Sequence, residues 1–94
     1  MIAPAITSVE PLRPFVVRVT FADGEVRDVD IEPLLEGPAF APLRDRGEFR
    51  RVAVDDATGA VVWSSGADLD PDVTYGIAPA AGTPAARVTT PQAV

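Results

Sequence analysis

The strongest constraint on the fold is the alternation of apolar and polar side chains over residues 15–21. Phe15, Val17, Val19 and Phe21 fall on one parity, and the other parity is mostly polar. A period of two is typical of a β-strand that buries one face. The segment therefore predicts a strand that packs its aromatic and valine side chains into a core.

Segments on both sides of this strand predict an antiparallel meander. Residues 6–10 have a weaker strand pattern, and the prolines of residues 11–14 favour a turn. Residues 22–24 (ADG) tolerate positive φ values and predict a reversal into a third strand over residues 25–31. The apolar positions of this third strand change parity after Val26, which predicts a bulge or a change of face.

Short helical turns are expected after the meander. Residues 33–37 begin with proline and end with glycine, as a single helical turn often does, and residues 40–44 form a second compact turn. Asp45 and Glu48 have the spacing of a capping box, which predicts a short helix that ends at Arg51.

A second hairpin completes the predicted fold. Residues 52–55 and 60–63 have the pattern of two short strands, joined by a loop at residues 56–59. We therefore expect an α+β fold, with one small antiparallel sheet of about five strands in a single domain over residues 1–77. Residues 78–94 are rich in Ala, Pro and Thr and predict a poorly folding C-terminal tail.

The composition removes most catalytic chemistry. The chain has no His and no Cys, and all eight of its cationic side chains are Arg. Proton transfer, metal binding and nucleophilic catalysis depend largely on the missing residue types, so we expect neither an enzyme nor a cofactor.

Charge and hydropathy limit the partners and the location. A net charge of −6 opposes direct binding to nucleic acid and favours a basic protein partner. No apolar run is long enough to span a membrane, and the first residues lack the pattern of a signal peptide. With no Cys to form disulfides, we expect a cytoplasmic protein.

The most patterned segment is the run WSSGADLDPD at residues 63–72. Asp70 is suited to cap a helical turn, Pro71 to occupy its first position, and Gly76 to end it. Gly66 is the turn residue that precedes this cap. Gly66, Asp70 and Pro71 are therefore predicted to have structural roles.

Three carboxylates in this run alternate as in the first half of a calcium loop. Counted from Asp68, however, the turn glycine of such a loop is replaced by Val73 and its bidentate glutamate by Pro79. We expect no metal. The carboxylates are instead predicted to cap the turn, and they also offer an acidic contact surface.

Trp63 and Tyr75 flank the acidic run, and two interpretations of them stay open. They either pack in the core and at its rim, or they are exposed anchors for a protein partner. Under the second interpretation the candidate partner contacts are Trp63, Asp68, Asp72 and Tyr75.

Arginines gather at one place in the sequence, at positions 44, 46, 50 and 51. Arg46 and Arg50 are four residues apart and would share one face of a helix. Such a cluster is usually a solvated face, and the alternative is a contact with a phosphate or an acidic partner.

Four runs of the sequence resemble the bacterial family called domain of unknown function 2442. They are VTFADGE at residues 19–25, PLLEG at 33–37, FAPL at 40–43 and WSSGADLDPD at 63–72, and the resemblance extends from Val9 to Tyr75. It implies a small α+β domain with no catalytic residues to carry over. Members of this family often occur beside a second small family, domain of unknown function 4160, in an arrangement suspected to be a toxin–antitoxin pair.

Charge, composition and resemblance together predict a non-enzymatic, acidic protein-interaction module, an antitoxin-like partner of a small basic protein. The alternative is a structural or regulatory domain that associates with itself through an exposed strand edge and has no DNA-binding element of its own.

Overall fold

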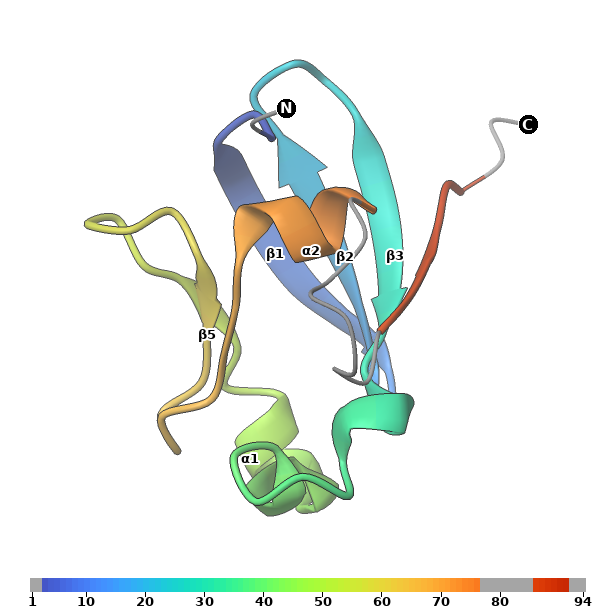
Figure 1. The fold of residues 1–94 in the computed structure, drawn as a ribbon, viewed down its shortest axis with the longest axis vertical. Coiled ribbons are helices and arrows are strands. Elements are labelled where there is room, and N and C mark those ends of the chain that lie inside the picture. Colours follow the sequence, from blue (N-terminus) through green and yellow to red (C-terminus); the bar gives the residue numbers. More distant parts are fainter. Residues whose placement is uncertain (1–2, 77–85, 92–94) are drawn as a thin grey trace.

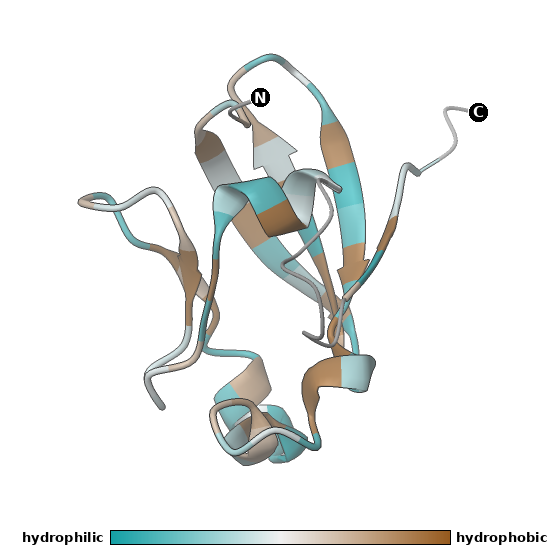
Figure 2. Ribbon diagram, viewed as in Figure 1, coloured by the Kyte–Doolittle hydropathy of each residue, from teal (hydrophilic) through white to brown (hydrophobic). Residues whose placement is uncertain are grey.

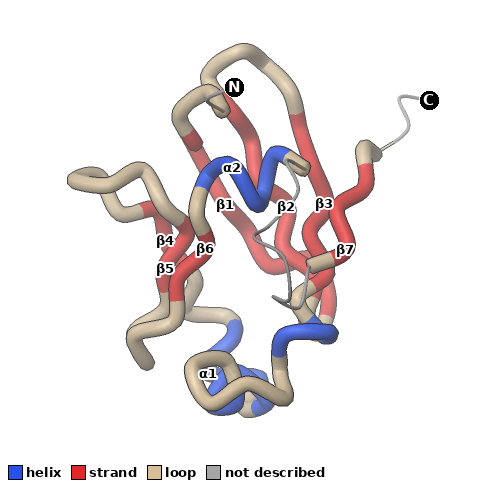
Figure 3. Tube along the Cα trace, in the orientation of Figure 1, coloured by secondary structure: helices blue, strands red, loops and turns tan. Residues whose placement is uncertain are grey.

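Two antiparallel sheets form the framework of the chain (Figures 1 and 3). The computed structural model describes residues 3–76 and 86–91. The first sheet has the strand order β1-β2-β3-β7, and its strands are β1 (Ile6–Arg13), β2 (Val16–Phe21), β3 (Val26–Asp30) and β7 (Arg87–Thr89). The second has the order β4-β5-β6, with β4 (Ala53–Val54), β5 (Val61–Val62) and β6 (Asp68–Leu69).

Short helical segments connect and cover the sheets. Two 3-10 helices, η1 (Glu32–Leu34) and η2 (Ala41–Arg44), lead into the helix α1 (Arg46–Phe49), and α2 (Pro71–Tyr75) lies beside the first sheet (Figure 1). These segments confirm the predicted helical turns and the α+β class. The described residues form seven strands rather than about five, and β6 and β7 are the two that were not predicted.

The alternation that predicted the central strand is confirmed in β2. Val17 and Val19 are fully buried, and Phe21 is 2% exposed. Phe15 lies before the strand, in the turn between β1 and β2, and has a φ of 69°. Its ring packs edge-on against Phe49, with the ring centroids 5.8 Å apart, so this aromatic side chain still contributes to the core.

The turn predicted at residues 11–14 is wrong in its position. β1 continues through Pro11 to Arg13, with a register shift between these two residues, and the chain reverses at Pro14 and Phe15. β1 is an edge strand, where a residue without a backbone donor is tolerated. The prolines therefore lie at an irregular end of β1, where Pro11 and Arg13 still pair with residues of β2.

The bulge predicted in the third strand is also absent. All five residues of β3 pair with β2 in one unbroken register, and Figure 2 shows its polar residues lying between two apolar ones. Arg27 has the same parity as the buried Val29, and its guanidinium carbon lies 4.8 Å from the centre of the Tyr75 ring. Arg27 thus occupies the position where an apolar side chain would continue the alternation of Val29. The Tyr75 ring packs on its guanidinium group, so the alternation is interrupted without a bulge.

Part of the predicted tail is ordered in the first sheet. β7 pairs antiparallel with β3, and Val88 stands opposite Val29 and packs against the core. This corrects the prediction of a poorly folding tail for residues 87–89, where a β-branched run outweighs the surrounding prolines. The rest of that prediction, at residues 78–85 and 92–94, lies outside the described residues.

The second sheet extends the predicted hairpin by one strand. β4 and β5 confirm the hairpin, and β6 pairs with β5 because Gly66, with a φ of 99°, turns the chain back after Trp63. The backbone N–H of Trp63 donates to the carbonyl of Ala67 across 2.9 Å. One hydrophobic core, which contains residues of both sheets and of η1, η2 and α1, joins the two halves.

Candidate interaction surface

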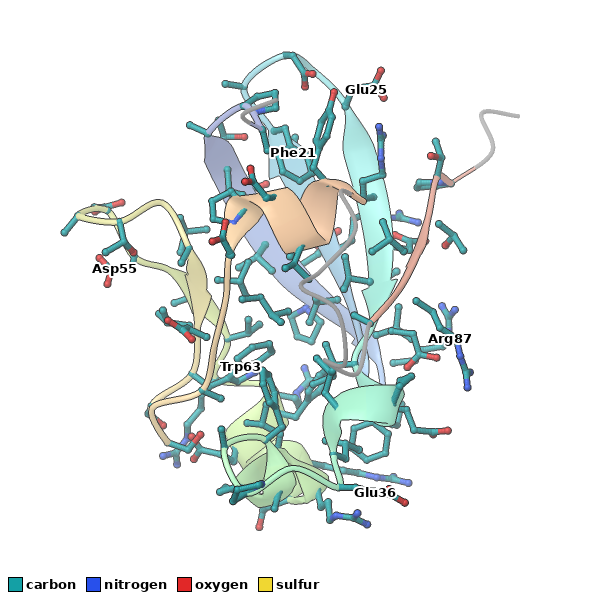
Figure 4. The ribbon with its side chains drawn as sticks, in the orientation of Figure 1. Phe21, Glu25, Glu36, Asp55, Trp63 and Arg87 are labelled. Carbon is teal, nitrogen blue, oxygen red and sulfur yellow. The ribbon has the colours of Figure 1, made fainter. Side chains whose placement is uncertain are left out.

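The segment from residue 52 to residue 76 carries five carboxylates and no basic side chain. It folds into the second sheet and α2. We call its five carboxylates the acidic surface: they belong to Asp55, Asp56, Asp68, Asp70 and Asp72. Figure 4 shows Asp55 on the loop between β4 and β5, which projects from the body of the molecule.

Three carboxylates of the acidic surface line a hollow of about 660 Å³. Asp68, Asp70 and Asp72 line it together with Pro71, residues 3–5 and residues 58–60. Among the described residues, no basic side chain lines the hollow. A basic side chain that entered it would therefore meet these carboxylates.

Asp70 caps α2, as the sequence predicts. Its Oδ1 accepts a hydrogen bond from the backbone N–H of Asp72 across 3.0 Å, and Pro71 occupies the first turn. Gly76 ends the helix with a φ of 100°. The structural roles predicted for Asp70, Pro71 and Gly66 agree with this geometry, since Gly66 makes the left-handed turn before β6.

Asp72 has a structural contact in addition to its place in the hollow. Its Oδ1 accepts a hydrogen bond from the backbone N–H of Ala3 across 2.9 Å, which ties α2 to the segment before β1. Its side chain is therefore half-buried and only partly available to a partner.

The remaining carboxylates of the acidic surface, those of Asp55, Asp56 and Asp68, make no hydrogen bond to a distant part of the chain that the structure describes. Asp55 accepts a hydrogen bond from the backbone N–H of Ala57 across 2.8 Å within its own loop. Asp56 and Asp68 are exposed, and their side chains make no hydrogen bond or ion pair with any described residue. Asp56 and Asp68 are thus the charges most open to a partner.

Trp63 is a core residue, so its prediction as a partner contact is wrong. It is 3% exposed, and Figure 4 shows it between the second sheet and the helical segments around α1. Its Nε1–H donates to the carbonyl of Phe49 across 2.9 Å, and its ring stacks on that of Phe49 at a centroid distance of 6.3 Å. A buried indole that satisfies its donor inside the fold confirms the alternative interpretation, core packing.

Tyr75 lies at the rim and fastens α2 to the first sheet. Its ring packs edge-on against Phe21 at 4.8 Å, and its hydroxyl donates to Oδ2 of Asp23 across 2.8 Å. Arg27 covers the ring. These contacts occupy the ring and the hydroxyl, so Tyr75 holds α2 in place, and its role as a partner contact stays a prediction.

The hydrogen bond between Tyr75 and Asp23 changes the pKa of both side chains. Accepting the hydrogen bond from the backbone N–H of Glu25, together with the one from Tyr75, lowers the pKa of Asp23. The hydrogen bond to the Asp23 carboxylate, helped by partial burial, raises the pKa of Tyr75. Both shifts favour the protonated tyrosine beside the ionised aspartate at neutral pH.

The sequence named part of this surface and missed part of it. Asp55 and Asp56 were not candidates, because the β4–β5 loop is distant in sequence from residues 63–72. The available signal was the absence of any cation between Arg51 and Arg87. All five carboxylates lie in this stretch without a cation, whereas the motif at residues 63–72 contains only three of them.

Residues 3–76 and 86–91 contain neither a cluster of metal ligands nor a membrane-spanning helix. Within these ranges no three His, Cys, Asp or Glu side chains are grouped as a metal site requires. Likewise, no helix in them combines the length and the apolar character needed to cross a membrane.

The two antiparallel sheets and their short helices make this a small α+β domain. A family model described as "Protein of unknown function (DUF2442)" matches residues 6–80, so the chain belongs to that family. No curated protein and no solved structure matches the chain.

Proposed function

We propose that this chain is a non-enzymatic protein-interaction module that binds a small basic protein through its acidic surface. In this proposal the protein acts in the cytoplasm as the antitoxin-like member of a pair. The partner places Lys or Arg side chains in the hollow beside α2 and against the β4–β5 loop.

The observation that carries the proposal is the separation of charge on the molecule. The described residues contain four ion pairs, and the carboxylates that make them belong to Glu25, Asp28, Asp30 and Glu48. None of these lies on the acidic surface. The five carboxylates of that surface therefore have no ion-pair partner among the described residues, and such uncompensated charge speeds association and selects partners of opposite sign.

Composition and family resemblance support the rest of the proposal. With no His, Cys or Lys, the chain lacks the side chains that most often exchange a proton near neutral pH or activate a serine hydroxyl. The resemblance supports a protein partner, because members of the family often occur beside a second small family in a suspected toxin–antitoxin arrangement.

A pair of matched charge variants tests the proposal. The first, Asp55→Asn/Asp56→Asn/Asp68→Asn, removes three charges from the acidic surface and keeps the side-chain oxygen that Asp55 uses in its loop. The second, Glu10→Gln/Glu32→Gln/Glu36→Gln, removes three exposed charges elsewhere. Each changes the net charge from −6 to −3.

The readout is retention of partners from cells of the native host by the tagged proteins, with quantitative mass spectrometry. We expect a stoichiometric small basic protein on the wild type and on the glutamate variant, and its loss from the aspartate variant. Equal retention by both variants, or no retained basic protein on the wild type, contradicts the proposal.

The second candidate function is self-association through a strand edge. β1 and β7 are the two edges of the first sheet, and β1 is eight residues long. Pro11 removes one donor from β1, and β7 has only three residues, so each edge is poorly suited to extended pairing. Recovery of the wild type alone, as a dimer that persists at high salt, favours this second function over the first.

A further inference from the structure

A groove between the end of β1 and the helix α1 gathers three arginines. Arg13 is the last residue of β1, and Arg46 and Arg50 lie one helical turn apart at the two ends of α1. All three line the same hollow, which has a volume of about 310 Å³. We call this hollow the arginine groove.

The arginine groove has no acidic side chain among its lining residues. Four other arginines of the chain lie within 4.0 Å of a carboxylate, whereas Arg13, Arg46 and Arg50 pair with none of the described acidic residues. In a protein of net charge −6, these three neighbouring cations without an ion-pair partner in the described chain form a basic cluster. An anion bound there would compensate their mutual repulsion.

The rest of the groove is apolar. Pro11, Leu12, Pro14 and Phe49 complete its lining. The ring of Phe49 is almost fully buried and is held by contacts with Phe15 and Trp63. A ligand that fits this groove therefore has an apolar body that rests on Pro11, Leu12 and Pro14 and an anionic group that reaches the guanidinium groups.

The turn that follows Arg13 is conformationally unusual. Phe15, two residues later, has a φ of 69°, a value that bulky residues rarely adopt and that costs energy. Its carbonyl accepts a hydrogen bond from the backbone N–H of Ile31 across 2.7 Å, and its ring is packed against Phe49. The surrounding structure thus holds a strained turn beside the arginines, and retained strain of this kind is concentrated at binding sites.

We propose that the arginine groove binds a small ligand that carries one carboxylate or phosphate group on an apolar body. Guanidinium groups bind both kinds of anion through paired N–H donors. The volume is at the lower end of the range for small-molecule sites, and it is too small for an extended polymer. This site is separate from the acidic surface, so it does not depend on the proposed function.

Nuclear magnetic resonance titration of the ¹⁵N-labelled full chain tests this site with four probes. Benzoate and phenyl phosphate carry the two candidate anions on the same ring. Benzamide is the neutral match for benzoate, and inorganic phosphate lacks the apolar body. We expect saturable amide shifts at Leu12, Arg13, Phe15 and residues 46–50 with benzoate or phenyl phosphate, and weaker effects with the other two probes. The tighter of the two anions then identifies the group that the site prefers.

Paired variants locate the binding. Arg13→Gln/Arg50→Gln removes two cations from the groove, and Arg44→Gln/Arg51→Gln removes two exposed cations outside it. We expect affinity for the better anion to fall about tenfold in the first variant, as for loss of charged hydrogen bonds, and to stay near the wild-type value in the second. The spectrum of each variant without ligand reports whether it is folded.

Several results would overturn the proposal. They are the absence of saturable shifts at the groove with both anions, equal binding of benzamide and benzoate, or an equal loss of affinity in both arginine variants. Saturation of the groove by a 12-nucleotide RNA at lower concentration than either small anion would also overturn it, because it would assign the groove to a polymer.

Discussion

The indole N–H of Trp63 donates to the carbonyl oxygen of Phe49 across 2.9 Å, and the two rings stack. Trp63 directly follows β5, and Phe49 is the last residue of α1. The bond therefore joins the second sheet, which carries most of the acidic surface, to the helical segments below it. The position of the acidic surface depends on this buried contact.

Replacing Trp63 by Phe should destabilise the fold. The change removes the indole donor, leaves the Phe49 carbonyl without its partner and opens a small cavity, for a total cost of about 2–4 kcal/mol. Urea unfolding followed by circular dichroism measures this, because the variant lacks the only tryptophan of the chain. A cost below about 0.5 kcal/mol would show that the bond does not hold the two parts together.

Asp70 should matter for its oxygen and not for its charge. Asp70→Ala removes the acceptor that caps α2 and should cost about 1 kcal/mol. Asp70→Asn keeps an equivalent oxygen and should cost much less, so the pair separates capping from charge. An unchanged melting temperature for Asp70→Ala would refute the cap.

A side chain at position 66 should destabilise the fold, and the reason is the backbone conformation of Gly66 and not a lack of space. Its φ is 99°, and a Cβ placed on it would meet no atom within 4 Å. Gly66→Val should therefore cost about 1–2 kcal/mol through the left-handed conformation and not through a clash. Thermal unfolding of Gly66→Val and of Gly59→Val, another open position with a positive φ, should give losses of similar size. A neutral Gly66→Val would contradict the turn.

The hydrogen bond between Tyr75 and Asp23 should make stability fall at alkaline pH. The folded state raises the pKa of Tyr75 above its ordinary 10.0, so the stabilisation is complete below pH 10 and is lost as the pH rises through the folded pKa. With one Tyr and no Lys or Cys, Tyr75 is the only side chain that titrates between about pH 8 and pH 12.

The measurement is urea unfolding at a series of pH values from 8 to about 11.5, with tyrosinate absorbance to follow the ionisation. Tyr75→Phe should be less stable at pH 8 and should lose the alkaline decline. A decline that persists unchanged in Tyr75→Phe would assign it to another process. At the acid end the sign is opposite: the pKa of Asp23 is lowered, so its contribution is lost as the pH falls below the ordinary 3.8.

Residues 87–91 should contribute to the stability of the first sheet. Ending the chain at residue 86 removes β7 and the packing of Val88 against the core, which should cost about 1–2 kcal/mol. Removing only residues 92–94 is the matched control, which leaves β7 complete. Equal melting temperatures for the full chain and the chain that ends at residue 86 would mean that β7 does not stabilise the sheet.

The sequence predicted elements whose signal is local. Alternation gave β2, and the cap residues Asp45 and Asp70 gave the starts of α1 and α2, because each depends on a few adjacent residues. β7 could not be predicted in this way, because its pairing with β3 joins residues 57 to 61 positions apart. The same limit applies to the site: Arg13 and Arg46 line the same groove, yet they are 33 positions apart in the sequence.

Trp63 illustrates why the candidate contacts were only partly identified. A tryptophan beside an acidic run has the same sequence pattern whether it is an exposed anchor or a core residue. The choice depends on whether its N–H finds a partner inside the fold, and that partner, the carbonyl of Phe49, is 14 residues away. The exposure of the carboxylates is easier to predict from sequence than that of Trp63, because charged side chains lie at the surface in almost any fold.

The most direct test of the interaction proposal is the affinity of the purified basic partner for the two charge variants, measured by isothermal titration calorimetry at low and at high salt. We expect Asp55→Asn/Asp56→Asn/Asp68→Asn to bind at least about tenfold more weakly than the wild type at low salt, and salt to weaken the wild type more than this variant. Glu10→Gln/Glu32→Gln/Glu36→Gln should bind like the wild type. Equal affinity of the two variants would contradict the assignment of the acidic surface as the binding site.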